Sequence, residues 1–197
     1  YSERGANILI AAPSSGGSLG ITTTSGTNQY TNNFGGTSSA APLVAGVVAL
    51  ILEARPDLTA RDVQHVLVHS ARQIDVNDAG WSRNNGGSGF WINDKYGFGM
   101  IDAQAAVTVA LSWQKVSTQL NATTGVIQAN VAIPDNNPTG VTVSFTVPES
   151  SDMLLEHVEL VINATHTWRG DLRFTLTSPR GTQSIIENRF FDSNQNF

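Results

Sequence analysis

The 197-residue chain contains the run Phe34-Gly35-Gly36-Thr37-Ser38-Ser39-Ala40-Ala41-Pro42, in which two glycines precede a serine and small residues lead into an apolar segment. The glycines permit a tight turn, and the apolar segment predicts a helix. Ser38 is therefore expected in the first turn of this helix, with its backbone N–H unpaired and pointing outward. Together with the partial positive charge of the helix N-terminus, that N–H would stabilise an oxyanion.

Ser38 has two interpretations at this point. In an ordinary glycine turn before a helix, Ser38 would be the N-cap, because serine side chains commonly accept a hydrogen bond from the first turn. Alternatively, Ser38 is a catalytic nucleophile, and the small residues 39–41 leave room beside it for a peptide backbone and an imidazole. The tripeptide alone does not separate the two.

Three helices are predicted within the first 111 residues. Pro42–Ala54 is apolar on every face, which is typical of a helix inside a larger domain, and Pro42 is suited to its first turn. Thr59 is predicted to be the N-cap of a second helix, and Asp62 completes a capping box. Apolar residues at helical spacing follow. Asp102–Leu111 predicts the third helix.

The segments around these helices predict strands and loops. Ala6–Pro13 and Gly20–Thr24 are apolar runs of strand length. The polar residues that follow, up to Thr37, and the Gly/Asn/Ser-rich segment Trp81–Gly99 predict irregular loops.

Beyond residue 122 the pattern changes to strands alone. Apolar residues alternate with polar ones in 141–147, 158–162 and 172–176, and Ser178–Gly181 has the composition of a turn. A period of two in several segments bounded by turns predicts an antiparallel β-sandwich.

Composition excludes several classes of protein. The net charge is −5 and no Lys/Arg cluster is present, which argues against nucleic acid as a partner. The chain has no cysteine, which excludes thiol catalysis, disulfides and thiolate metal sites. No apolar run is expected to reach the ~18 residues that a membrane helix needs, and a hydrophobic content of 40% is enough for a packed core.

The match around Ser38 extends well beyond a tripeptide. Gly36-Thr37-Ser38-x-Ala40-x-Pro42-x-x-Ala45-Gly46 resembles GTSxAxPxxAG, the serine signature of the subtilisin-like serine proteases (peptidase S8). Leu58–His65 resembles the LTWRDxQ stretch of the kexin/furin proprotein convertases, and Tyr96–Ala103 is similar to their YGxGxxDA stretch. Leu155–Val158 and Arg169–Thr182 resemble the P domain that follows the protease in that family.

This resemblance implies a fold of two parts. The first is the C-terminal part of an α/β subtilisin-like catalytic domain, with a parallel sheet and buried helices. The second is part of an all-β, jelly-roll-like P domain. The expected boundaries are 1–111 for the peptidase part, 112–122 for a linker and 123–197 for the partial P domain. The P domain is expected to pack on the catalytic domain within a monomer.

The resemblance also implies a serine endopeptidase that hydrolyses polypeptides and cleaves after basic residues. In the family the triad is Asp, His and Ser in chain order, and an Asn completes the oxyanion hole. Ser38 matches the nucleophile, and the backbone at Thr37 and Ser38 matches the oxyanion and substrate-backbone site. The other groups are expected upstream of Tyr1, so this chain alone is expected to be inactive.

An alternative function stays open beside the enzyme. It is a catalytically inactive, subtilase-derived binding or structural module whose β-sandwich recognises a partner. In either case the resemblance implies a secreted protein, extracellular or periplasmic, or in the secretory pathway of a eukaryote.

Calcium is the cofactor that the resemblance implies. Tyr1-Ser2-Glu3 resembles the YSE segment of kexins, in which the glutamate is one of three carboxylates that bind a structural calcium ion. Glu3 is therefore the candidate metal ligand, and a terminal surface glutamate is the alternative. His65 and His69 have the spacing of a zinc pair, but no HExxH pattern accompanies them, and both are expected to be structural.

Two further motifs have ordinary explanations. Arg169-Gly170-Asp171 is an RGD tripeptide that is expected to form a structural turn rather than an adhesion site. Asn121-Ala122-Thr123 and Asn163-Ala164-Thr165 fit the glycosylation acceptor rule, which has meaning only in a eukaryotic source.

Overall fold

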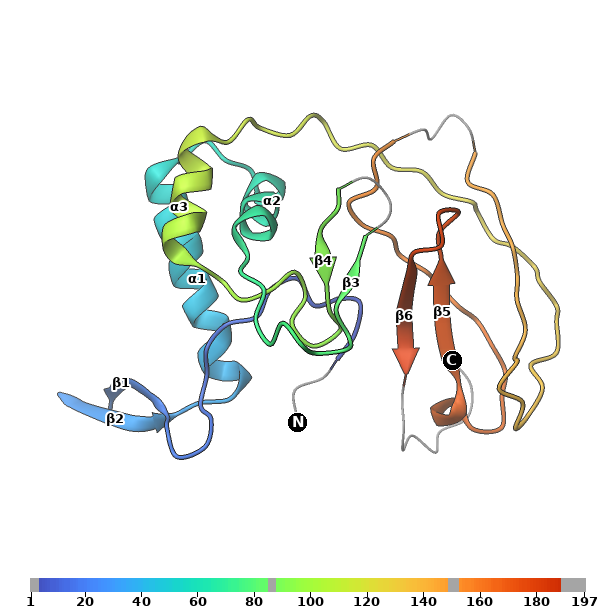
Figure 1. Cartoon of the computed structure of the whole chain (residues 1–197), viewed down its shortest axis with the longest axis horizontal. Coiled ribbons are helices and arrows are strands. Elements are labelled where there is room, and N and C mark those ends of the chain that lie inside the picture. Colours follow the sequence, from blue (N-terminus) through green and yellow to red (C-terminus); the bar gives the residue numbers. More distant parts are fainter. Residues whose placement is uncertain (1–3, 85–87, 149–152, 189–197) are drawn as a thin grey trace. The chain divides into compact units, whose positions relative to one another are not determined.

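The structure, a computed structural model, describes residues 4–84, 88–148 and 153–188. Contacts divide the chain into two compact units, Tyr1–Val116 with Arg173–Asn188, and Ser117–Leu172. The elements follow one another as β1 (Ile21–Ser25), β2 (Gln29–Phe34), α1 (Thr37–Ala54), α2 (Ala60–Ser70), β3 (Ser82–Arg83), β4 (Trp91–Ile92), α3 (Ala103–Ser112), the short 3-10 helix η2 (Arg169–Asp171), β5 (Arg173–Thr177) and β6 (Gln183–Asn188) (Figure 1).

Three helices build the core of the first unit. Helix α3 packs against both α1 and α2, and Ile51 of α1 and Val66 of α2 are completely buried between them. Apolar side chains at 3.6-residue spacing meet in this way because they lie on one face of each helix. The buried core consists of Val47, Ile51, Leu58, Val63, Val66, Leu67, Ile101, Ala106 and Ala110.

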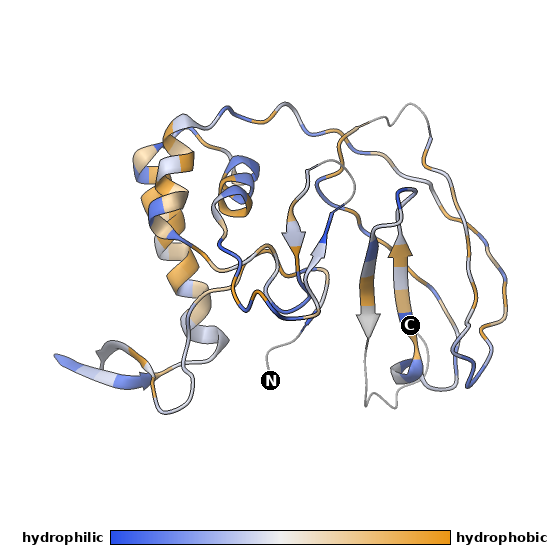
Figure 2. Cartoon of the chain, in the orientation of Figure 1, coloured by the Kyte–Doolittle hydropathy of each residue, from blue (hydrophilic) through white to orange (hydrophobic). Residues whose placement is uncertain are grey.

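Helix α1 is longer and less covered than the sequence predicts. It begins at Thr37 rather than Pro42, and outside its Val47 and Ile51 stripe Leu50 stays 47% exposed. Figure 2 shows apolar residues along most of the helix. By length and composition α1 could span a membrane, which corrects the expectation that no apolar run is long enough. Val47 and Ile51 of this helix belong to the buried core, and its Leu43, Val44 and Val48 pack partly buried against that core.

The second helix confirms its predicted cap, and the third helix has a cap that was not predicted. At the start of α2, Thr59 Oγ1 accepts a hydrogen bond from the Asp62 N–H at 3.2 Å, and Asp62 Oδ2 accepts one from the Thr59 N–H at 2.8 Å. At the start of α3, Asp102 accepts a hydrogen bond from the Ala105 N–H. The capping box of α2 is local in sequence, which is why the sequence predicts it.

The strands differ from the predicted parallel sheet. The described strands form three two-stranded antiparallel sheets, β1–β2, β3–β4 and β5–β6. The predicted strand Ala6–Pro13 is reduced to isolated bridges at Ile10 and Ala11, the second of which is parallel, to Met100. A buried strand needs partners on both sides, and within the described chain these residues meet only short segments.

Two predicted loops contain short hairpins. Strand β2 lies in the polar segment before Thr37 and pairs with β1, because Gly26 and Asn28 adopt the positive φ values that a tight turn requires. Strands β3 and β4 lie within Trp81–Gly99.

In the second unit the predicted strands at 141–147 and 158–162 form no strand in the described residues. Their alternating apolar side chains remain partly exposed, with Phe145 at 42%. The predicted strand at 172–176 is found as β5, which belongs to the first unit, and it pairs with β6 across the predicted turn at Ser178–Gly181. The jelly-roll arrangement of this part therefore stays a prediction.

Candidate active site

Ser38 is the second residue of α1, and its side chain is exposed. The N-cap of the helix is Gly36, and no side chain caps it. The interpretation of Ser38 as N-cap is therefore wrong. The first N–H groups of a helix have no intrahelical acceptor, so the Ser38 N–H lies where an anion would be bound, beside an exposed hydroxyl.

The two glycines before the helix are needed for different reasons. Gly36 adopts φ 72° and ψ −170°, a conformation that only glycine accepts without strain. Gly35 lacks space instead, because a Cβ there would lie 2.0 Å from Ser15 Oγ. The sequence predicts a tight turn here, and the structure shows that both positions exclude a larger residue.

Pro42 is in the interior of α1 rather than in its first turn, contrary to the prediction. A helical amide at position 42 would donate to the carbonyl of Ser38, four residues earlier. Proline has no N–H, so the turn that begins at Ser38 is held by one hydrogen bond fewer than a regular turn.

Three serine hydroxyls surround the Gly36 peptide groups. Ser14 Oγ donates to the Gly36 carbonyl at 2.6 Å and lies 2.8 Å from Ser39 Oγ. Ser39 Oγ also donates to the Gly36 carbonyl, at 3.0 Å, and Ser39 is buried. On the other side, the Gly36 N–H donates to Ser15 Oγ at 3.2 Å. Sequence reasoning missed Ser14 and Ser15, because nothing near them indicates a contact with residues 21 or more positions away.

The β1–β2 hairpin leads directly into this turn. Its last pair joins Ile21 to Phe34, the residue before Gly35. The two strands approach closely at Gly20, where a Cβ would lie 2.2 Å from the Asn32 carbonyl oxygen. The hairpin therefore ends at the residue before the glycine turn that precedes Ser38.

The other predicted site residues are placed as follows. Thr37 is the first residue of α1, exposed and adjacent to Ser38. Glu3 lies outside the described residues. Among the described residues, no group of three His, Asp or Glu side chains is close enough to hold a metal ion.

His65 and His69 both pack on aromatic rings next to α2. The His65 ring stacks on Trp113 at 5.9 Å between centroids, and the His69 ring meets Phe90 at 4.8 Å and Trp113 at 5.1 Å in edge contacts. Partial burial, followed by the neighbouring His65, lowers the pKa of His69. These contacts are those of structural side chains, as the sequence analysis predicts.

Asp62 makes contacts that no sequence motif predicts. Its Oδ1 accepts hydrogen bonds from Trp113 Nε1 at 3.1 Å and from the Val116 N–H at 2.8 Å. Burial of Asp62 opposes ionisation, but these bonds and those from Thr59 outweigh it, and the pKa of the carboxyl lies well below its usual range. A buried carboxylate thus fastens the segment after α3 to the start of α2.

A second polar cluster lies in the loop around β3 and β4. Asp78 forms an ion pair with Lys95 and accepts a hydrogen bond from Asn93, and hydrogen bonding from Lys95 first, then from Asn93, lowers the pKa of Asp78 to about 2. Tyr96 donates to Asp75 at 3.0 Å, and Asp75 has a positive φ. These bonds hold the loop in one conformation.

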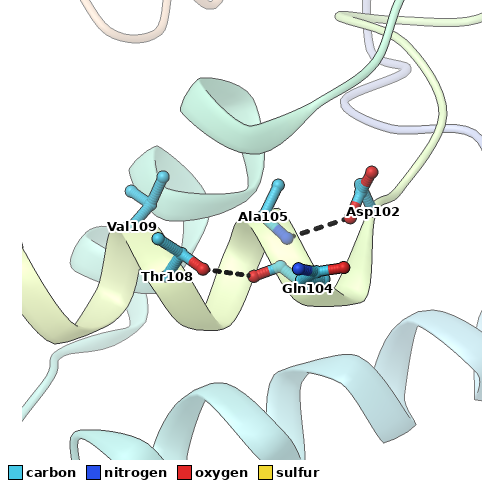
Figure 3. Close-up of a pocket in the computed structure, with 5 residues that line it drawn as sticks. All are labelled: Asp102, Gln104, Ala105, Thr108 and Val109. Atoms are coloured by element: carbon cyan, nitrogen blue, oxygen red, sulfur yellow. Dashed lines mark hydrogen bonds between the residues drawn. The ribbon is translucent and has the colours of Figure 1, made fainter.

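Two remaining features carry no chemistry. A shallow depression on α3 is lined by Asp102, Gln104, Ala105, Thr108 and Val109, and the hydrogen bonds in it are the helix cap and a Thr108 bond to the Gln104 carbonyl (Figure 3). The RGD tripeptide forms the 3-10 turn η2, in which Gly170 is buried. A buried centre favours the predicted turn over an adhesion site.

Comparisons with known proteins match both parts of the chain. Residues 1–99, which include the whole Ser38 turn and helices α1 and α2, match the Subtilase family (Peptidase S8). Residues 155–197 match the proprotein convertase P-domain.

Individual proteins are also similar to this chain. A PC3-like endoprotease of Hydra vulgaris is 40% identical over 169 residues, which are 84% of this chain and 24% of the relative. Human proprotein convertase subtilisin/kexin type 5 is 39% identical over 201 residues, which cover 98% of this chain and 11% of the relative. The chain thus spans a quarter or less of the length of these two relatives.

Solved structures give the same assignment. The serine protease of Aeromonas sobria superposes with a TM-score of 0.62 and 29% identity, over 84% of this chain and 31% of that protein. The turn that presents Ser38, the helix behind it and the sequence matches agree with one another. The chain belongs to the subtilase family of serine proteases and is related to the proprotein convertases within it.

Proposed function

We propose that this chain supplies the nucleophile of a serine endopeptidase, and that the nucleophile is Ser38. The observation that carries the proposal is the position of Ser38, exposed in the first turn of α1, within the segment that matches the subtilase family. Backbone N–H groups of this turn are suited to bind an oxyanion.

The proposed reaction is acyl transfer to water. Ser38 Oγ attacks the carbonyl carbon of the scissile peptide bond while a histidine base takes its proton. The negative charge that develops on the carbonyl oxygen is held by the Ser38 N–H and by an asparagine side chain. The same histidine then protonates the leaving amine as the C–N bond breaks, and water hydrolyses the Ser38 ester by the reverse sequence of steps.

The histidine, its aspartate partner and the asparagine are proposed to come from outside these 197 residues. The contacts found for His65 and His69 are with Trp113 and Phe90. His157 pairs with Glu159 and His166 bonds to Trp168. The proposal rests on the family order, in which the base precedes the nucleophile.

The test is the substitution Ser38→Ala in the complete protein. Loss of a triad serine removes several orders of magnitude of rate, so peptide hydrolysis should fall to near background. Ser18→Ala, an exposed serine of the loop that precedes the β1–β2 hairpin, is the matched control and should keep the parent activity. Appreciable hydrolysis by the Ser38→Ala variant would mean that the nucleophile is another residue. Binding of a protein or carbohydrate partner by an inactive parent would favour the alternative binding module.

We also propose that the protease cleaves after basic residues, in keeping with its similarity to proprotein convertases. Initial rates on paired peptides that differ only in Arg-Arg or Leu-Leu before the scissile bond measure this. A preference for Arg-Arg supports the proposal, and equal rates contradict it.

Calcium binding, secretion and intramolecular packing of the P domain complete the proposal. Among the residues that the structure describes, no cluster of carboxylates fits calcium, and we propose Glu3 as one ligand of such a site. If it exists, EGTA should lower the melting temperature of the complete protein, and added Ca²⁺ should restore it. An unchanged melting temperature would exclude a structural calcium ion.

A further inference from the structure

We propose that Ser14 and Ser15 are positioning residues for the nucleophile: their hydroxyls fix the conformation of Gly36 and so set the direction in which Ser38 presents its hydroxyl and its N–H. The inference rests on the proposed function, because it assigns a role in the same reaction. It goes beyond the serine signature, which contains neither residue.

The two hydroxyls hold the peptide groups on both sides of the Gly36 Cα. Ser15 Oγ accepts from the Gly36 N–H at 3.2 Å, and Ser14 Oγ donates to the Gly36 carbonyl at 2.6 Å. The N–H belongs to the peptide plane before the Gly36 Cα, and the carbonyl belongs to the plane after it. The angle between these two planes is set by φ and ψ of Gly36 alone.

Gly36 needs these hydrogen bonds to keep one conformation. Its φ of 72° and ψ of −170° are one choice among many that glycine accepts, and the loss of that freedom costs more for glycine than for any other residue. Hydrogen bonds on both sides select one conformation. Ser39 adds a third hydrogen bond, because its buried hydroxyl also donates to the Gly36 carbonyl at 3.0 Å.

The conformation of Gly36 affects the reaction proposed at Ser38. Thr37 and Ser38 follow Gly36 directly as the first two residues of α1, so rotation about Gly36 changes the direction of the chain that enters the helix. An oxyanion donor works only when it is already oriented toward the developing charge. A nucleophile displaced by ~1 Å loses about a hundredfold in rate. The helix alone does not prevent this displacement, since Pro42 removes one hydrogen bond from its first turns.

The experiment compares Ser14→Ala and Ser15→Ala with the parent and with the Ser18→Ala control, all in the complete protein. The readouts are kcat and KM on one peptide, the rate constant for inactivation by a fluorophosphonate, and the melting temperature. Active-site titration corrects every rate for the amount of competent enzyme. A fluorophosphonate reports on Ser38 directly, because Ser38 Oγ forms the bond to phosphorus and fluoride leaves.

For the Ser14 and Ser15 variants we expect kcat and the inactivation rate to fall together, by about tenfold to a hundredfold. KM should stay within about twofold, and Ser18→Ala should match the parent. Ser14→Thr, which keeps a hydroxyl at this position, should recover part of the kcat that Ser14→Ala loses.

Two different results would overturn the inference, and they are distinguishable. An active parent whose Ser14→Ala and Ser15→Ala variants keep the parent kcat per titrated site would show that the hydroxyls serve folding alone. A parent protein without peptidase activity would overturn the proposed function, and the positioning role would fall with it.

Discussion

At the scale of single residues, the turn before Ser38 depends on two glycines that no other residue replaces equally. Gly36 is restricted by its backbone conformation and Gly35 by its distance from Ser15. The sequence predicts the turn and Ser38 because the motif that carries them is contiguous. Ser14 and Ser15 could not be predicted, because their hydrogen bonds to Gly36 join segments that only the folded chain brings together.

Gly36→Ala should therefore destabilise the chain. A Cβ at this φ and ψ costs about 1–3 kcal/mol, and urea unfolding of the 197-residue chain measures the loss. Gly16→Ala is the matched control, because Gly16 has no positive φ and its added Cβ would meet no atom within 4 Å. An equal loss of unfolding free energy in both variants would contradict the assigned strain at Gly36.

His69 provides a prediction on pH. Its folded-state pKa is lowered, first by partial burial and then by His65, so the unfolded chain binds more protons around its ordinary pKa of about 6.5. The contribution of neutral His69 is complete above that pH and is lost as the pH falls through about 6.5 toward the lower folded pKa. Between pH 7.5 and 5.5, His69→Gln should therefore lose less unfolding free energy than the parent. Equal losses would show that His69 does not titrate differently in the folded chain.

At the scale of elements, Asp62 connects two features that are separate in the sequence. It caps α2 through Thr59 and binds Trp113 and Val116, which follow α3. The capping box was predictable because its members are three residues apart. The contacts with Trp113 and Val116 were not, because they span 51 and 54 residues.

Asp62→Asn keeps the size of the side chain, but an NH₂ group replaces one acceptor oxygen and then faces hydrogen-bond donors. Because Asp62 is fully buried, we expect a loss of about 2–3 kcal/mol in the free energy of unfolding. Asp57→Asn is the control, since the Asp57 pairs with Arg55 and Lys115 are exposed, and it should lose much less. Similar losses in both variants, measured by urea unfolding, would mean that Asp62 does not hold the segment after α3 to the start of α2.

The same carboxylate should make stability sensitive to acid. Its pKa is lower in the folded than in the unfolded state, so its contribution is present above the ordinary pKa of about 3.9 and is lost as the pH falls below it. The Asp62→Asn variant should therefore lose less stability than the parent between pH 5 and pH 3. A parallel loss in both would exclude Asp62 as a source of this dependence.

The helices and strands of the chain differ in how far their prediction succeeds. All three helices of the first unit are found, because helical periodicity and caps are written within a dozen or so residues. Helix α1 begins at Thr37, which confirms the expectation of Ser38 in its first turn, whereas Pro42 lies inside the helix and not in that turn. Strands at 141–147 and 158–162 are not found, because alternation indicates a strand but does not supply the partner that it must pair with.

At the scale of the whole molecule, two family matches follow one another along the chain. The subtilase match ends at residue 99 and the P-domain match begins at residue 155. The 197 residues contain the proposed nucleophile, and the base and the oxyanion asparagine are proposed to come from outside these residues. The 197-residue chain alone should hydrolyse no peptide that the complete protein cleaves, as measured by fluorogenic release at equal concentrations. Equal rates would place the base within this chain.

The most direct test of the account is the site of covalent modification. The complete protein is treated with a fluorophosphonate, digested, and sequenced by tandem mass spectrometry. The account predicts one phosphonylated residue, Ser38, with the adduct absent in Ser38→Ala and present in Ser18→Ala. An adduct on another serine, or none in a protein that cleaves peptides, would contradict the assignment of Ser38 as the nucleophile.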